Sequence, residues 1–267
     1  GVQGKLRSSA PLYSPRLWAS IATGKVPAKH GIAAFVRPDG AGGKRLYTSH
    51  DRRVPALWNI LSSRGFSIGV VNWWTTYPPE KLDGVMVSDH FFPEQIEMIR
   101  STFKANTDQG GVLAYPESWA VRASEIVARQ EAVVPIGDPF ADNTAMPAWV
   151  NRELLSRQYQ TDHDVARVAL EIDRELRPDV MFVFFPGIDR ISHWLWGNLE
   201  PEELYPPPLR PAPEAREAGA EALRRYYEFT DALIGRLLEG RDPGDLVVVI
   251  SDHGFEAGVS LMLLTGE

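Results

Sequence analysis

The 267-residue chain contains no cysteine. It therefore has no disulfide, no thiolate metal ligand and no cysteine nucleophile, although this absence leaves the cellular compartment open. Any bound metal ion must be held by carboxylates and by the six histidines. Oxygen and nitrogen ligands of this kind make hard or borderline divalent cations the candidates.

The chain also lacks a long apolar run. Its longest apolar stretches, VMFVFFPGI (180–188) and LVVVI (246–250), are far shorter than the ~20 residues that a membrane helix needs. Continuous short runs of this type are typical of buried strands. We therefore expect a soluble domain with no membrane segment, and we favour the cytoplasm.

An excess of positive charge is absent as well. The formal net charge is −7 and no basic stripe is visible, so phosphate neutralisation on a nucleic acid is not expected. An acidic protein can still bind a small phosphate ester if metal ions supply the local positive charge. With 44% hydrophobic residues, the chain has enough apolar side chains for either one large domain or one domain that carries a long insertion.

Neither end of the chain is typical of a complete protein. Gly1 is not an initiator methionine, and the sequence stops at LMLLTGE (261–267), shortly after a polar loop. We expect the chain to be a fragment or a processed piece.

Helical and strand patterns alternate along the chain. Helical spacing is expected at 15–23, 54–65, 94–105, 116–130, 147–176 and 216–239, and apolar strands at 66–73, 84–92, 179–187 and 245–251. This alternation predicts an α/β fold with a doubly wound, mainly parallel sheet. We expect a single domain over 1–267, with helical insertions and a cap at about 93–145, and a proline-rich loop at 200–215.

Two expected strands lead into clusters of polar residues. Asp189 and His193 follow the strand at 179–187, and their four-residue spacing lets both face one way on a helical turn, as a metal site requires. Asp252 and His253 follow the last strand, and Gly254 permits the irregular backbone that adjacent ligands need. Alternatively, Asp189 caps a turn, His193 is a surface residue and Asp252–His253 is a polar loop.

A similar sequence, VSDHFF (87–92), makes Asp89 and His90 competitors for the metal role. It lacks the glycine, so we favour a structural or substrate-facing role. His163, within TDHDVAR (161–167), is expected on a solvated helix face. The aromatic stretch NWWTTY (72–77) either lines a pocket or packs in the core.

Ser14 precedes Pro15 at an expected helix start, where serine is a common cap. The same geometry suits catalysis, because a helix N-terminus offers N–H groups and positive dipole to an anion. Serine is a weak nucleophile unless a base or a metal lowers its pKa. Since no G-x-S-x-G elbow is present, metal activation is the favoured explanation.

Three motifs in order, SPRLWASIATGKVPAKHGI (14–32), GIDRISHWLWG (187–197) and ISDHGF (250–255), resemble the alkaline phosphatase superfamily. The resemblance is strongest to its type I phosphodiesterase/nucleotide pyrophosphatase branch, with bacterial phosphohydrolase and phosphomutase relatives. It implies that Ser14 is the nucleophile, that Asp189 and His193 bind one divalent ion, and that Asp252, His253 and the Ser14 oxygen bind a second. Zn²⁺ is the expected ion, with Mn²⁺ as the alternative.

This sequence also departs from the pattern of the family in two respects. The first metal aspartate and the last metal histidine of the family would lie before Gly1 and after Glu267. Nucleotide pyrophosphatase members carry asparagine at the position of Phe35, so specificity for nucleotide diesters is not expected to carry over.

The expected function is metal-dependent hydrolysis of phosphate mono- or diesters through a phosphoserine on Ser14. The alternatives are a phosphomutase that uses the same phosphoserine, hydrolysis of sulfate or phosphonate esters, and a catalytically inactive, metal-poor binding domain. The sequence leaves the substrate and the oligomeric state open.

Overall fold

A computed structural model describes residues 1–106, 110–146, 150–205, 207 and 210–256. The chain divides into two compact units. Unit 1 contains residues 1–133, 163–185 and 240–253, and unit 2 contains residues 134–162, 186–239 and those that follow 253. Helix α6 (Arg152–Leu176) contributes its first part to unit 2 and the remainder to unit 1.

Unit 1 is built on a four-stranded sheet in the order β5–β4–β3–β6. Its strands are β3 (Ile68–Val71), β4 (Gly84–Val87), β5 (Ala114–Tyr115) and β6 (Val180–Val183). β3 pairs in parallel with β4 and with β6, whereas β5 runs antiparallel to β4. The expected α/β class with a mainly parallel sheet is therefore confirmed. The individual strands are shorter than the apolar runs that predicted them.

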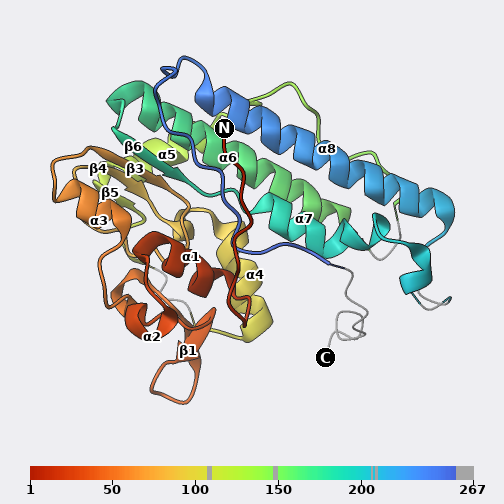
Figure 1. Cartoon of the computed structure of the whole chain (residues 1–267), viewed down its shortest axis with the longest axis horizontal. Coiled ribbons are helices and arrows are strands. Elements are labelled where there is room, and N and C mark those ends of the chain that lie inside the picture. Colours follow the sequence, from red (N-terminus) through yellow and green to blue (C-terminus); the bar gives the residue numbers. More distant parts are fainter. Residues whose placement is uncertain (107–109, 147–149, 206, 208–209, 257–267) are drawn as a thin grey trace. The chain divides into compact units, whose positions relative to one another are not determined.

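Helices and one hairpin complete unit 1 (Figure 1). They are α1 (Ser14–Thr23), α2 (Pro27–His30), α3 (Leu57–Ser62), α4 (Pro93–Phe103) and α5 (Ser118–Ala128), the hairpin strands β1 (Val36–Pro38) and β2 (Lys44–Leu46), and the 3₁₀ turns Ser49–Asp51 and Asp89–Phe91. α3 contacts β3, and α5 contacts β4 and β5. The helices expected at 54–65, 94–105 and 116–130 are thus present with shorter bounds.

Helix α1 begins one residue earlier than expected, at Ser14, so that Tyr13 takes the capping position and Pro15 lies in the first turn. It ends where the Thr-Gly pair predicts. Gly24 adopts the left-handed conformation (φ 64°) and its N–H donates to the Ser20 carbonyl. Glycine is suited to this position because it has no Cβ to clash in that conformation.

The core of unit 1 is rich in tryptophan. Trp18 of α1 meets Trp73 edge-on, with ring centroids 4.8 Å apart, and Trp58 of α3 meets the same ring at 6.0 Å. Edge-to-face pairs of this kind stabilise by about 0.5–1.5 kcal/mol beyond the area they bury. The rings therefore join α1 and α3 to the loop that follows β3.

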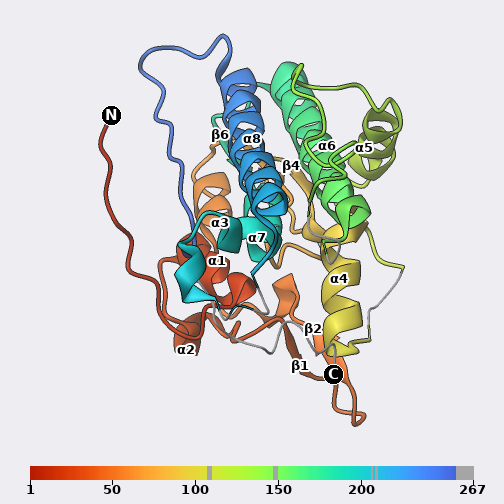
Figure 2. The same ribbon diagram turned by 90° about the vertical axis from the view of Figure 1, so that its right-hand side faces the viewer.

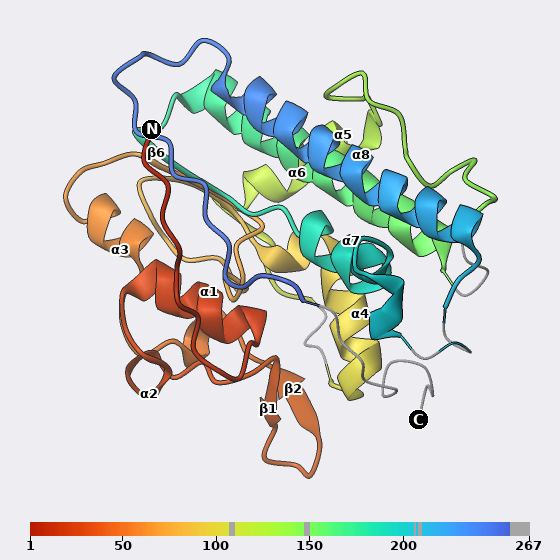
Figure 3. The ribbon, with the colours of Figure 1, turned by 45° about the vertical axis from the view of Figure 1, so that its right-hand side comes forward.

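Unit 2 consists mainly of helices. It contains the first part of α6, α7 (Gly187–Leu195), α8 (Pro213–Leu238), and the 3₁₀ turns Trp196–Asn198 and Glu202–Leu204. Within unit 2, α8 lies beside the first part of α6 (Figures 2 and 3), and the rings of Tyr159 and Phe229 pack between them at 4.5 Å. The helices expected at 147–176 and 216–239 are confirmed as α6 and α8, except that 147–149 lie outside the described residues.

The buried strand expected at 245–251 is wrong. These residues form no regular structure, and Leu246, Val248 and Val249 are 88%, 66% and 72% exposed. An apolar run becomes a strand only when its backbone pairs with a neighbouring strand, and composition alone does not determine that pairing. Among the described strands β6 pairs only with β3, so one of its edges carries no strand partner, yet residues 245–251 do not pair with it.

The solvated helix face expected for TDHDVAR (161–167) is also wrong. Thr161, Asp162 and His163 are buried. The physical reason lies in the helical period, because Asp162 precedes the buried residues Val165 and Ala166 by three and four positions and so shares their face.

Among the described residues, no helix combines the length and the apolar character needed to cross a membrane.

His30 provides a test of the packing around α1. Its Nδ1 accepts the Ile32 N–H at 3.1 Å, and its Nε2 lies 2.9 Å from the Ser20 hydroxyl. Burial, reinforced by Arg16 and Arg52, lowers the pKa of His30 to about 4. The neutral ring therefore contributes stability that is complete above the ordinary pKa of 6.5 and is lost as the pH falls towards 4.

As the pH falls from 6.5 towards 4, we expect His30 to lower the free energy of unfolding of the native chain by up to about 1.4 kcal/mol per pH unit. Urea denaturation between those pH values measures the slope, and His30→Gln is the comparison. A His30→Gln slope as steep as that of the native chain would contradict the prediction.

Candidate functional site

The loops that follow the strands of unit 1 meet at the carboxyl edge of the sheet. Asn72 comes directly after β3 and adopts the left-handed conformation (φ 59°). Its side-chain amide donates to the Phe184 carbonyl, just after β6, at 3.2 Å. In open parallel sheets this edge is where ligands bind.

Asp89, which follows β4, is fully engaged within the protein. One of its oxygens accepts the Thr75 N–H at 2.8 Å, and the other accepts the Tyr77 N–H at 3.0 Å. Burial raises the pKa of Asp89, while His90 and these hydrogen bonds oppose the shift. Asp89 thus holds the loop 72–77 in place, in agreement with the structural role favoured for this SDH sequence.

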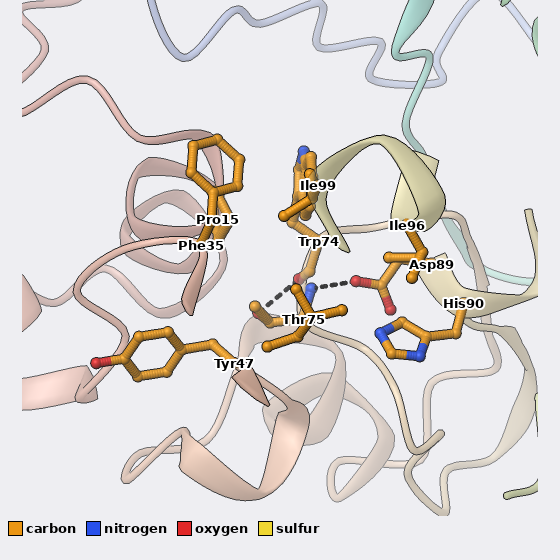
Figure 4. Close-up of a pocket in the computed structure, with 10 residues that line it drawn as sticks. Pro15, Phe35, Tyr47, Trp74, Thr75, Asp89, His90, Ile96 and Ile99 are labelled. Atoms are coloured by element: carbon orange, nitrogen blue, oxygen red, sulfur yellow. Dashed lines mark hydrogen bonds between the residues drawn. The ribbon is translucent and has the colours of Figure 1, made fainter. Parts of the chain in front are cut away.

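A small hollow, which we call the Trp74 hollow, lies beside this loop (Figure 4). Its volume, including the open mouth, is about 230 Å³, and its lining residues are Pro15, Phe35, Leu46, Tyr47, Trp74, Thr75, Asp89, His90, Ile96 and Ile99. The stretch NWWTTY therefore does both things that the sequence suggested. Trp74 and Thr75 line the Trp74 hollow, whereas Trp73 packs in the core.

The walls of the Trp74 hollow are mainly apolar and aromatic. Phe35 lies 5.8 Å from Trp74 and 5.5 Å from Phe103, ring centroid to ring centroid. His90 stacks on Tyr77 at 4.0 Å, and burial lowers its pKa while Asp89 opposes the shift. Pro15, the residue after Ser14, is one of the residues that line the hollow.

Ser14 is the first residue of α1 and is 8% exposed. In the turn that follows it, the N–H groups of Arg16 and Leu17 both donate to the Tyr13 carbonyl, at 3.0 and 3.1 Å. These two donors are therefore already used within the chain. Ser14 needs positive charge from another source if it is to act on a phosphoryl group.

Asp252 and His253 lie together in unit 1. Asp252 Oδ2 is 3.8 Å from His253 Nε2, and both side chains are largely buried. The Ser8 hydroxyl donates to the Asp252 carbonyl, which attaches the N-terminal segment to this pair.

Asp189 and His193 lie on α7 in unit 2. Their spacing places both on one side of the helix, with Asp189 Oδ1 3.5 Å from His193 Nε2. Ile191 and Leu195 are buried on another side of the helix. His193 also meets the Phe255 ring edge-on at 5.1 Å. The helix therefore orients an oxygen and a nitrogen donor towards each other.

Each Asp–His pair offers a carboxylate oxygen and an imidazole nitrogen. This donor chemistry fits Zn²⁺ or Mn²⁺, which bind such ligands without thiolate. Across the described residues, no group of three or more His, Cys, Asp or Glu side chains is gathered that could hold a metal ion. The structure thus brings the predicted ligands together two by two.

Sequence reasoning missed the contact that Gly187, the first residue of α7, makes with Asp162 and Tyr226. Two signals pointed to it: the helical spacing that puts Asp162 on the buried face of α6, and the glycine that opens the GIDRISH motif.

The mainly parallel sheet and the two Asp–His pairs define an α/β protein with donors of the kind that phosphoryl-transfer enzymes use. The chain matches the family model of type I phosphodiesterase / nucleotide pyrophosphatase over residues 1–262, and it belongs to this family. The resemblance drawn from the three motifs is thereby confirmed. No curated protein and no solved structure gives a significant match. Family membership indicates a hydrolase of phosphate esters, of the phosphodiesterase or pyrophosphatase type.

Gly187 allows a direct test of how tightly α7 is seated. A Cβ at this position would overlap the Tyr226 hydroxyl and the Asp162 carboxylate. We expect Gly187→Ala to destabilise the protein by about 1–3 kcal/mol, the usual cost of overpacking. Thermal or urea denaturation measures the change.

The matched control is Gly235→Ala in α8, where a Cβ would meet no atom within 4 Å. It should stabilise by about 0.5–1 kcal/mol, because alanine is the better helix former. Equal effects of the two substitutions would contradict the close packing at Gly187.

Proposed function

We propose that this protein is a metal-dependent hydrolase of phosphate mono- or diesters that works through a phosphoserine intermediate on Ser14. The observation that carries the proposal is the presence, in a chain of the phosphodiesterase family, of two Asp–His pairs whose donor atoms lie 3.5 and 3.8 Å apart. On this proposal Asp189 and His193 hold one divalent cation, and Asp252, His253 and the Ser14 oxygen hold a second.

The donor set favours Zn²⁺, with Mn²⁺ as the alternative. The chemistry that such ions supply when bound is neutralisation of charge on a phosphoryl group and a lowered pKa for a hydroxyl or a water. Ser14 requires this help, because serine is a weak nucleophile until its pKa is lowered.

The proposed reaction has two displacements at phosphorus. Ser14 Oγ forms a bond to phosphorus while the bond to the ester oxygen breaks, the Ser14 proton leaves to solvent, and the departing oxygen takes a proton from water. A water molecule then attacks the phosphoserine, the phosphorus–Oγ bond breaks, and Ser14 regains its proton. Phosphate, or a phosphate monoester if the substrate is a diester, is released.

The Trp74 hollow supports a substrate with an apolar or aromatic group beside the phosphate. Phe35 forms part of its wall, at the position where nucleotide pyrophosphatase members were expected to carry asparagine. We therefore propose a small phosphate ester other than a nucleotide diester.

We also propose that the chain acts as one domain of the alkaline phosphatase type with a doubly wound sheet. The parallel pairing of β3 with β4 and β6 supports this architecture. Residues 93–145, which contain α4 and α5, are the proposed insertion.

The first test removes the nucleophile. Ser14→Ala should lower turnover of an aryl phosphate ester to background, because no other oxygen would form the covalent bond. Mass spectrometry of the native chain after an acid quench should detect phosphate on Ser14 and should not detect it in the variant. Ser9→Ala, at an exposed serine of the same segment, is the control and should retain activity. Undiminished turnover by Ser14→Ala would refute the assignment.

The second test concerns the metal. Chelation should abolish turnover, and Zn²⁺ or Mn²⁺ should restore it; Asp189→Asn and His253→Gln should each lower the metal content measured by elemental analysis. Release of free phosphate identifies hydrolysis, whereas retention of phosphate in the product would identify a phosphomutase. A native chain without tightly bound metal would favour an inactive binding domain.

A further inference from the structure

Asp162 of α6 is 0% exposed, and each of its oxygens has a partner within unit 2. Oδ1 accepts the Gly187 N–H at 3.3 Å, and Oδ2 accepts the Tyr226 hydroxyl at 2.8 Å. The carboxylate therefore connects three helices: its own, α7 through Gly187, and α8 through Tyr226.

The bond to Gly187 falls at a special position of α7. Gly187 is the first residue of the helix, and its N–H is one of the N-terminal donors that no carbonyl of the same helix can satisfy. A negative charge at this end also interacts favourably with the helix dipole. Asp162 thus supplies, from another helix, the acceptor that a capping side chain would otherwise provide.

Gly187 is packed tightly against Asp162 and Tyr226, so that glycine is the residue that fits this position. Gly187 lies so close to the Tyr226 hydroxyl and the Asp162 carboxylate that a methyl group would overlap both. α7 has only nine residues, and Asp189 lies in its first turn. A shift or rotation of Gly187 therefore moves Asp189 directly, since two residues span about 3 Å along a helix.

Burying the Asp162 carboxyl group costs free energy of folding. Burial raises the pKa of Asp162 to about 7, although Tyr226, Gly187 and the nearby Arg190 all favour the charged form. Burial and the Asp162 carboxylate together raise the pKa of the Tyr226 hydroxyl well above its ordinary value. A nonpolar residue at position 162 would avoid the cost of burying a carboxyl group.

We propose that Asp162 and Tyr226 are positioning residues that fix the first turn of α7, and so orient Asp189 towards His193 for binding a divalent cation. This inference rests on the metal role of Asp189 and His193 in the proposed function. Asp162 and Tyr226 act through Gly187.

The experiment measures binding of Co²⁺ in the full chain, by calorimetry and by visible absorption. All variants carry His253→Gln, so that the Asp189–His193 pair is the one proposed site left intact. Asp162→Leu removes both acceptors and should weaken Co²⁺ binding by about 10–100-fold, the range found when groups that orient metal ligands are removed. Asp162→Asn retains an oxygen for the Gly187 N–H and should bind Co²⁺ nearly as tightly as the parent.

Stability is measured in parallel by thermal denaturation, with titrations made well below each melting temperature. A merely structural Asp162 would lower the melting temperature of Asp162→Leu and leave Co²⁺ binding of the folded protein unchanged, which would overturn the inference. If Asp162→Leu does not fold, Tyr226→Phe decides: weaker Co²⁺ binding supports the inference and unchanged binding overturns it. Asp189→Asn tests the metal site separately from the positioning role of Asp162. If this substitution does not weaken Co²⁺ binding, the metal site itself is refuted.

Discussion

The pairing of β3 on both of its edges is the interaction on which unit 1 depends. Ile68 lies opposite Gly84 on one side and opposite Val180 on the other, and the three parallel strands therefore end at one edge. The residues that follow the strands meet there because of this register. Asn72 reaches the Phe184 carbonyl, and Asp89 holds the loop after β3. Trp74, Thr75 and Asp89, which line the Trp74 hollow, belong to the loops that this pairing brings together.

In unit 2 a buried carboxylate accepts a hydrogen bond from the start of α7. The N–H groups at the start of a helix need acceptors, and α7 obtains one from Asp162 on a different helix. The same contact determines where Asp189 lies. Packing and chemistry are thus connected through a single short helix, whose buried side carries Ile191 and Leu195 and whose other residues include the predicted metal ligands.

Four of the aspartates separate into two kinds. Asp89 and Asp162 are buried and saturated by N–H and hydroxyl donors of the protein, so they act as internal acceptors. Asp189 and Asp252 instead lie within 4 Å of a histidine nitrogen, an arrangement that suits a shared cation. The local sequence SDH occurs in both classes, at 88–90 and at 251–253. The surroundings, and not the motif, distinguish a structural aspartate from a candidate ligand.

The sequence by itself determined the features that depend on neighbouring residues. The Thr-Gly end of α1, the shared side of Asp189 and His193, the long helices and the family all follow from local spacing and motif order. Tertiary structure alone decided what depends on distant partners. LVVVI at 246–250 has the composition of a strand, yet it forms none, because a strand also needs backbone pairing with a neighbour and these residues pair with none of the described strands. Asp162 lies in a polar stretch that predicts a solvated face, yet it shares the buried face of Val165 and Ala166, where Gly187 and Tyr226, far away in the sequence, supply its hydrogen bonds.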